Sequence, residues 1–187
     1  MIHSVRFICV LDTNVIYPLE IRDLLFWFAS YELFTPKWSK HIFTEWETVM
    51  RRHGIADEEI KKRIDKTNQA FPDALVTNYE SLVDSLDLPD ENDKHVLAAA
   101  IKTNANIIVT NNLKDFPTDY LANFGLSAKA PDDFLTDTID LNNDLALAAF
   151  RAMVMNRTNP DMDDYEVLAR LRKNGLKNSA DYLHALL

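Results

Sequence analysis

The sequence predicts an α/β fold with a central, mainly parallel sheet, followed by helices only. Short runs of β-branched and apolar residues, such as Arg6–Leu11 and Ile107–Thr110, have the composition of strands buried on both faces. Amphipathic segments lie between these runs, and strands that alternate with helices favour a parallel sheet. After Pro131 the strand-like runs stop and only helical patterns follow.

In the first half of the chain, proline and serine set the predicted boundaries. Pro18 falls in the first turn of a predicted helix, where proline is tolerated. Ser39 is the predicted N-cap of a helix that runs toward His53. The predicted elements are a strand at Arg6–Leu11, a helix at Val15–Ala29, a strand at Leu33–Thr35, the helix after Ser39, a helix at Asp57–Ala70 and a strand at Leu75–Thr77.

In the second half, the segment Asp90–Thr103 has the clearest helical pattern, because two acids at its start precede a run of small apolar residues. Strands follow at Ile107–Thr110 and Gly125–Ala130. The predicted C-terminal helices are Asn143–Arg157, Asp163–Lys173 and Ser179 to the end. We place a domain boundary after Thr136, which gives domains 1–136 and 137–187.

Composition excludes several classes of site. The chain has 187 residues, of which 47% are hydrophobic, and its single cysteine excludes an internal disulfide and a multi-cysteine zinc site. Its three glycines are isolated, so no glycine-rich nucleotide-binding loop can be written. The longest apolar runs are six residues, too short for a bilayer, and there is no signal-peptide pattern. We expect a cytoplasmic protein without membrane contact.

The net charge of −9 is opposite to that of a typical nucleic-acid-binding domain. The charges are unevenly placed, however. Between Lys37 and Lys66 eight basic residues stand against six acidic ones, whereas ten acids and six bases follow Pro131. One face can therefore meet phosphates, although solvated helix faces explain such clusters equally well.

Carboxylates follow the predicted strands in a regular way. Asp12 comes directly after the first strand, Asp115 comes soon after the IIVT strand, Asp90 and Asp93 begin a helix, and Glu45 lies within another. Functional groups collect at the carboxyl ends of parallel strands. Crowded carboxylates repel each other unless a cation lies among them, which predicts a site for Mg²⁺ or Mn²⁺. Such ions activate water and stabilise charge on a phosphodiester.

Each of these residues also has a structural interpretation. Asp12 can begin a turn, and Asp90 and Asp93 can be acids favoured at a helix N-terminus. Glu45 can be a surface acid. His95 is interpreted as structural or adjacent to substrate rather than as a metal ligand, because no HExxH motif accompanies it. The pattern alone leaves both interpretations open.

Four motifs, in the same order and spacing, resemble the PIN-domain ribonucleases, and among these most closely the VapC-type toxins of bacterial toxin–antitoxin pairs. They are VLDTNVI (Val10–Ile16), WSKHIFTEW (Trp38–Trp46), PDENDKHVLAAAI (Pro89–Ile101) and IIVTNNLKDFP (Ile107–Pro117). GLSAKAPDDFL (Gly125–Leu135) is similar to the closing strand and following turn of that family. The resemblance covers roughly residues 5 to 136 and implies a three-layer α/β/α fold.

The resemblance also implies roles for individual residues. Asp12, Glu45 and Asp93 match the three acids that hold Mg²⁺ or Mn²⁺ and carry catalysis. Asn112 stands where many members have a fourth acid, so Asp115 is expected to take that role and Asp90 to act as an auxiliary ligand. The residues expected to orient ligands or water are Thr13, Asn14, Ser39, Thr110 and Asn112.

The function implied is metal-dependent endonucleolytic cleavage of RNA, such as tRNA or rRNA, by the toxin of a type II pair that a cognate antitoxin inhibits. A homodimer is an expectation from the family. Two alternatives stay open. One is a non-catalytic PIN-like module that binds RNA or protein, in keeping with Asn112 and the acidic charge. The other is a phosphatase with Asp12 as nucleophile, which lacks an acid at Asn14.

Overall fold

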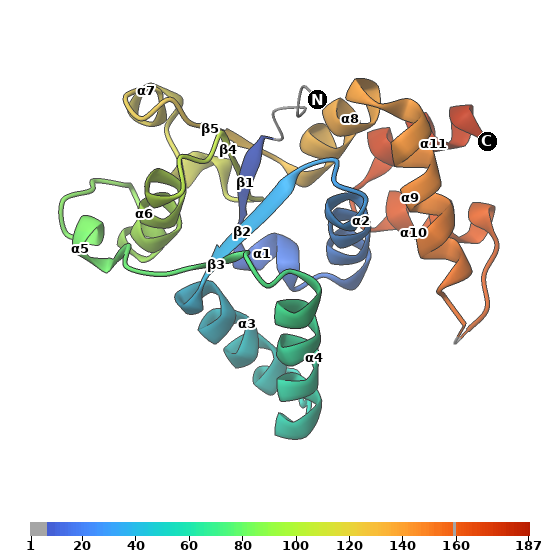
Figure 1. Ribbon diagram of the computed structural model, residues 1–187, viewed down its shortest axis with the longest axis horizontal. Helices are drawn as coiled ribbons and strands as arrows, with labels where there is room; N and C mark the ends of the chain where they lie inside the picture. The colour runs from blue at the N-terminus through green and yellow to red at the C-terminus, as the bar shows by residue number, and fades with distance from the viewer. Residues whose placement is uncertain (1–6, 159) are drawn as a thin grey trace. The chain divides into compact units, whose positions relative to one another are not determined.

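The computed structural model describes residues 7–158 and 160–187. Five parallel strands form one sheet in the order β3-β2-β1-β4-β5 (Figure 1). The strands are β1 (Ile8–Leu11), β2 (Thr35–Ser39), β3 (Leu75–Val76), β4 (Ile107–Val109) and β5 (Ser127–Lys129). The predicted α/β fold with a parallel sheet is confirmed. Arg6, the first residue of the first predicted strand, lies outside the described residues.

The central strand β1 is the most deeply buried part of the sheet. Cys9 pairs in register with Pro36 on one side and with Ile107 on the other. Cys9, Val10 and Leu11 have no exposed surface, which explains why this strand has apolar side chains on both faces. Burial raises the pKa of the Cys9 thiol well above its ordinary value, so this side chain stays neutral and packs as an apolar group.

Helices cover both faces of the sheet, as the three-layer prediction requires. On one side, the connection from β2 to β3 consists of α3 (Lys40–Arg52) and α4 (Asp57–Ala70), which pack against each other, and α3 also contacts β2. The chain then returns to β4 through α6 (Lys94–Lys102), which packs against β1, β2 and β4 on the other face. Shorter elements are α1 (Thr13–Ile16), α5 (Glu80–Val83), α7 (Thr118–Ala122) and the 3-10 turns Glu91–Asp93 and Leu113–Asp115.

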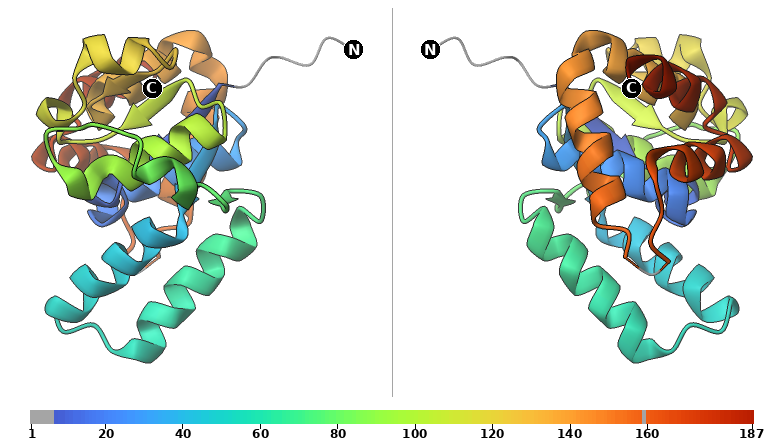
Figure 2. Two further views of the ribbon diagram at one scale, coloured as in Figure 1. Left: turned by 90° about the vertical axis from the view of Figure 1, so that its left-hand side faces the viewer. Right: turned by 90° about the vertical axis from the view of Figure 1, so that its right-hand side faces the viewer.

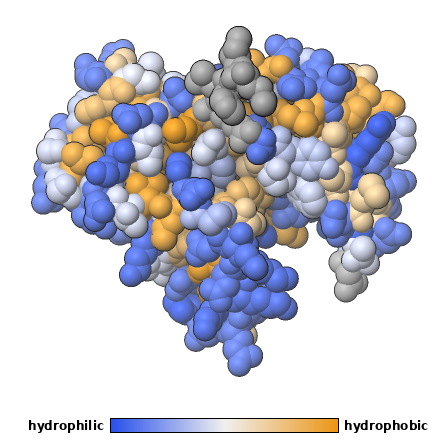
Figure 3. All heavy atoms as spheres, viewed as in Figure 1, coloured by the Kyte–Doolittle hydropathy of each residue, from blue (hydrophilic) through white to orange (hydrophobic). Residues whose placement is uncertain are grey.

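The helices α3 and α4 form an antiparallel hairpin, which Figure 2 shows from two sides. Ser39 caps α3 as predicted, since its hydroxyl accepts a hydrogen bond from the Ile42 amide at 3.2 Å. Gly54 forms the turn with a φ of +76°, a conformation that favours glycine. The surface over this hairpin is strongly hydrophilic in Figure 3, so the pair is anchored by the apolar face of α3 and is otherwise solvated.

A second compact unit consists of residues 18–34 and 130–187. It contains α2 (Leu19–Ser30), α8 (Pro131–Leu141), α9 (Asn143–Met155), α10 (Asp164–Lys173) and α11 (Lys177–Leu186). Within this unit α2 packs against α9, and α11 packs against α8 and α10. None of the helices in the described residues is both long and apolar enough to cross a membrane. The domain boundary after Thr136 falls inside α8 and stays a prediction.

The single helix predicted at Val15–Ala29 was wrong. The structure has α1 and α2 in its place, separated by Pro18, whose backbone is extended with a ψ of 123°. Proline has no amide hydrogen for an intrahelical bond, and here it ends one helix and precedes another instead of lying inside the first turn.

The strand predicted at Leu33–Thr35 is displaced toward the C-terminus and includes Pro36. The amides of Thr35 and Trp38 donate to opposite neighbours, Phe7 and Ala74. The nitrogen of Pro36 therefore faces the β3 side, where β3 pairs only with Trp38 and Ser39. No donor is needed at this point, which is why a proline fits within the strand.

Helix α8 was missed. The sequence analysis expected only a turn after Gly125–Ala130, but a helix begins at Pro131. Proline at the first helical position followed by Asp132 and Asp133 in the first turn is a favourable helix start. Asp132 also accepts hydrogen bonds from the Asn178 and Ser179 amides of α11, at 2.9 and 2.8 Å.

Candidate active site

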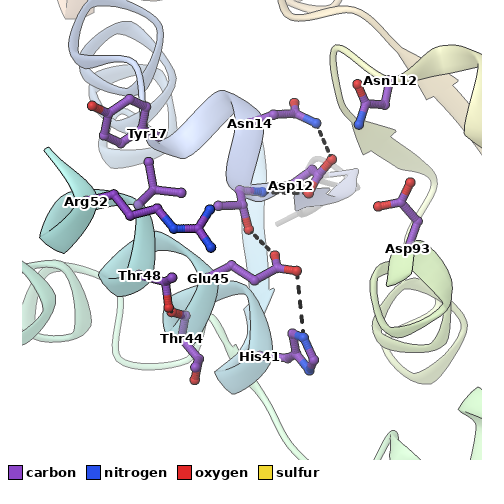
Figure 4. A pocket seen from close by; sticks show the side chains of 12 residues that line it. Asp12, Asn14, Tyr17, His41, Thr44, Glu45, Thr48, Arg52, Asp93 and Asn112 are labelled. Carbon is purple, nitrogen blue, oxygen red and sulfur yellow. Dashed lines mark hydrogen bonds and ion pairs between the residues drawn. The ribbon is translucent and has the colours of Figure 1, made fainter. Parts of the chain in front are cut away.

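A pocket of about 700 Å³ lies in the first compact unit, residues 1–17 and 35–129. Asp12 follows β1 and Asn112 follows β4, which are neighbours in the sheet. The chain adds β2 and β3 on the far side of β1, and β5 on the far side of β4. In open α/β sheets this point is where ligand-binding crevices form. Figure 4 shows the lining, which consists of Asp12, Thr13, Asn14, Tyr17, His41, Thr44, Glu45, Thr48, Val49, Arg52, Asp93 and Asn112.

Asp12 is held in place by three donors. It is only 4% exposed. The Thr13 amide donates to its Oδ1 at 2.6 Å, while Asn14 and the Thr110 hydroxyl donate to its Oδ2 at 2.5 and 2.7 Å. Burial raises the pKa of Asp12, whereas the hydrogen bonds from Thr110 and Thr13 act to lower it. This carboxylate is therefore buried and oriented, and its hydrogen bonds offset part of the cost of burying its charge.

Glu45 projects from α3 and lies beside one hydroxyl and two imidazole rings. The Thr13 hydroxyl donates to its Oε2, and His95 Nε2 lies 3.2 Å from its Oε1. His41 Nε2 lies 3.7 Å from the same oxygen, and the two imidazole rings are stacked with centroids 3.9 Å apart. Burial acts to raise the pKa of Glu45, but the hydrogen bonds from His95 and Thr13 outweigh it and hold that pKa below its ordinary value. Glu45 is thus kept ionised.

Asp93 has the opposite environment. Burial, reinforced by the negative charges of Asp12, Asp90 and Asp115, raises the pKa of Asp93 to about 6. Its Oδ2 is buried and accepts no hydrogen bond from any of the described residues. An orphaned carboxylate oxygen beside three other acids fits a position that a cation occupies, because a cation removes both the repulsion and the missing contact.

The other predicted site residues lie around this centre. Asp90 accepts two hydrogen bonds from Asn92 at 2.9 Å and caps the 3-10 turn that leads to Asp93. Asp115 does not line the pocket, although its charge acts on Asp93. Asn112 does line it, and its backbone N–H donates to the Thr110 hydroxyl at 3.0 Å. Ser39 acts on the site through α3, whose first turn it caps.

His41 and the pocket-lining face of α3, which ends at Arg52, were not predicted from the sequence. His41 precedes Glu45 by four residues, a spacing that places both on one face of a helix and that signals their proximity. Among the residues that the structure describes, His41, Glu45 and His95 are the one group of three potential ligands whose atoms all lie within 4.8 Å of one another. Of this group His41 and Glu45 line the pocket together with Asp12 and Asp93, whereas His95 does not line it.

Comparisons with known proteins agree with this arrangement. A family model described as the PIN domain matches residues 9–114, more than half of the chain, and one described as the VapC50 C-terminal domain matches residues 131–185. A Mycobacterium tuberculosis protein named "Putative ribonuclease VapC50" is 42% identical over 79 residues, which are 42% of this chain and 47% of that protein. The match thus spans about half the length of this curated relative. No solved structure matches the chain.

Proposed function

The chain belongs to the PIN-domain family, and on this premise we propose that it is a divalent-metal-dependent endoribonuclease, the toxin of a type II toxin–antitoxin pair. The relative described as a ribonuclease and the match of the helical segment to a VapC50 domain support this proposal. The observation that carries it is the convergence of Asp12, Glu45 and Asp93 on one pocket at the switch point of the sheet.

The donor set fits a hard divalent cation. Asp12 and Asp93 offer carboxylate oxygens, which Mg²⁺ and Mn²⁺ prefer, and the buried Oδ2 of Asp93 has no other partner among the described residues. We assign Asp12, Glu45 and Asp93 as the residues that hold the ion, with Asp90 as an auxiliary acid. When bound, such a cation activates water and offsets the charge that builds on a phosphodiester under attack.

The remaining polar residues keep these acids in position. Thr110 and Asn14 fix the rotamer of Asp12, since both donate to the same carboxylate oxygen. Thr13 holds Glu45 from the adjacent helix. Residues that orient metal ligands in this way affect metal affinity nearly as much as the ligands themselves.

The predicted fourth acidic position holds an asparagine. Asn112 lines the pocket in place of an acid and offers a neutral amide. Asp115, the predicted substitute, acts on Asp93 through its charge but does not line the pocket. We therefore propose one strong metal site at Asp12, Glu45 and Asp93, with Asp115 contributing through electrostatics or an intervening water.

The expected partners follow from the family. We propose an RNA substrate, such as tRNA or rRNA, in the cytoplasm, and a cognate antitoxin protein that blocks the pocket.

The VapC50-like helical segment has its own core, held in part by Arg157 and the buried Glu20, and we assign it no catalytic role. Self-association into a homodimer is a further expectation that sedimentation tests.

The proposal is tested by incubating purified protein, without antitoxin, with total bacterial RNA. We expect a few discrete fragments with Mg²⁺ or Mn²⁺, none with chelator and none with Asp93→Asn. Asp87→Asn, an exposed acid outside the pocket, serves as the matched control and should cleave normally. Absence of cleavage by the folded wild-type protein would instead favour the non-catalytic binding module.

A further inference from the structure

One face of α3 forms a continuous wall of the pocket. Six residues of this helix line the pocket, and each lies three or four positions from another member of the set. They are His41, Thr44, Glu45, Thr48, Val49 and Arg52. This spacing is that of one helix face. At about 1.5 Å of rise per residue, the wall extends roughly 16 Å along the helix. The pocket therefore continues well beyond the carboxylates, toward the C-terminal end of α3.

The end of this wall carries a positive charge. In Figure 4 the Arg52 side chain extends from α3 toward Asp12 and Glu45, and Asp93 lies on the far side of them. Among the described residues no ion pair or hydrogen bond engages the Arg52 side chain. A cation that is not neutralised by a neighbouring acid is available to a phosphate.

The adjacent Arg51 differs in this respect. Its guanidinium lies 2.7 Å from the Asp57 carboxylate and 3.5 Å from that of Glu47, and it does not line the pocket. Sequence charge alone places Arg51 and Arg52 in the same basic segment. The structure distinguishes the two arginines. Arg51 is already paired with two acids, whereas Arg52 faces the carboxylates of the pocket.

An aromatic ring lies at the same end of the pocket. Tyr17, at the C-terminus of α1, lines the pocket and is half-buried. Its ring packs against that of His53, with centroids 5.1 Å apart and planes tilted by 38°. Because His53 directly follows Arg52 at the end of α3, the ring and the guanidinium are positioned by the same helix end. Aromatic rings beside a cation are the usual components of single-strand nucleic-acid sites.

We propose that Arg52 and Tyr17 bind the nucleotide next to the scissile phosphate of a single-stranded RNA segment. Arg52 binds the phosphate of that nucleotide, and Tyr17 contacts its base or ribose. This inference rests on the proposed ribonuclease function. The volume of about 700 Å³ is within the range of sites that hold one small ligand. A site of this size suits one or two unpaired nucleotides, so the proposal takes the substrate to be single-stranded where it is cut.

The charge balance of the pocket supports the same assignment. Three carboxylates line it, in a chain with a net charge of −9. A divalent cation carries two positive charges against these three carboxylates, so it leaves no charge to compensate a second phosphate. A neighbouring phosphate then needs a cation of its own, and Arg52 is the single arginine or lysine that lines the pocket within the described residues.

The test is binding of a fluorescent single-stranded RNA octamer, measured by anisotropy in chelator so that cleavage does not contribute. Arg52→Gln is compared with Arg51→Gln, which makes the same change in charge one residue away. We expect Arg52→Gln to weaken binding about tenfold and to lower the salt slope by about 0.7, the value for one phosphate contact on a single strand. Arg51→Gln should change the dissociation constant less than twofold.

A second variant addresses the ring. Tyr17→Leu keeps an apolar side chain and removes the aromatic face, and we expect it to weaken octamer binding about tenfold without changing the salt slope. A duplex of the same sequence should bind at least tenfold more weakly than the single strand. Equal effects of Arg51→Gln and Arg52→Gln, or equal binding of duplex and single strand, would overturn the inference.

These outcomes are distinguishable from failure of the proposed function. Binding is measured without metal, so a protein that never cleaves RNA can still show the Arg52 effect, and that result would support the nucleotide site alone. If wild-type protein cleaves RNA but both arginine variants bind equally, the ribonuclease proposal stands and the nucleotide site is refuted. Thermal melts of each variant confirm that the fold is retained.

Discussion

Replacing Asp93 by asparagine should stabilise the metal-free protein while abolishing its metal-dependent activity. The folded protein raises the pKa of Asp93 from 3.8 to about 6, mainly through burial and then through neighbouring negative charges. The folded state therefore holds this proton more tightly than the unfolded chain. The stability that this proton contributes is fully present below the unfolded pKa and is lost as the pH rises through the folded pKa.

The size of the effect follows from the shift. Taken in full, the rise from 3.8 to about 6 corresponds to roughly 3 kcal/mol of lost stability above neutral pH. Asp93 is partly exposed, so screening by solvent reduces this value, and we use about 1.5 kcal/mol. For a chain of this size that is a rise of roughly 3 to 6 °C in Tm for Asp93→Asn.

The assay is thermal unfolding in chelator at pH 7.5 and at pH 4.5, with Asp87→Asn as the control for loss of one exposed charge. At pH 4.5 the Asp93 carboxylate is largely protonated in the folded protein, and the advantage of the amide should fall to about a third. Asp87→Asn should shift Tm by less than about 1 °C at both values. A lower Tm for Asp93→Asn at pH 7.5, or a gain that does not change with pH, would refute the reasoning.

Two further predictions concern the residues that support the site and the helical unit. Thr110→Val keeps the shape of a fully buried side chain but removes its 2.7 Å hydrogen bond to Asp12; we expect roughly tenfold weaker Mn²⁺ binding by calorimetry, and unchanged affinity would contradict the role of Thr110. Arg157→Met leaves Glu20, which is 6% exposed, without its closest cation. Urea unfolding should show that the free energy of unfolding falls by about 3 to 5 kcal/mol. A second change, Glu20→Met, should restore part of that stability if the buried charge is the cause.

The positions of the strands and of most helices along the chain were predictable because the signals are local. A buried strand needs apolar side chains on both faces, and β1 and β4 carry them in consecutive residues. Ser39 predicts the start of α3 because an N-cap can be identified from one residue and its neighbours. The break at Pro18 and the start of α8 at Pro131 show the limit of such signals. The same residue type ends one helix and begins another, and its context decides which.

The carboxylates of the site were predictable for a different reason. The positions of Asp12, Glu45 and Asp93 in the chain left a structural interpretation open, and the resemblance to the PIN family singled out these three acids. The structure brings them, from three separate segments, to one pocket. The imidazole pair was not predictable, because the contact of His41 with His95 depends on how α3 and α6 approach each other. Burial of the His95 side chain likewise depends on tertiary packing.

The two sides of the proposed metal site differ in the partners that their carboxylates already have, and this difference sets what we expect a cation to gain at each. Glu45 already has a hydroxyl and two imidazoles beside it, so a cation placed there replaces existing partners. Asp93 has a buried oxygen without a partner among the described residues and three acids around it, so a cation there adds a contact and removes repulsion. The same repulsion that lowers the stability of the metal-free fold thus supplies part of the affinity for the metal. Neutralising an acid next to Asp93 should therefore raise the stability of the metal-free fold and weaken metal binding.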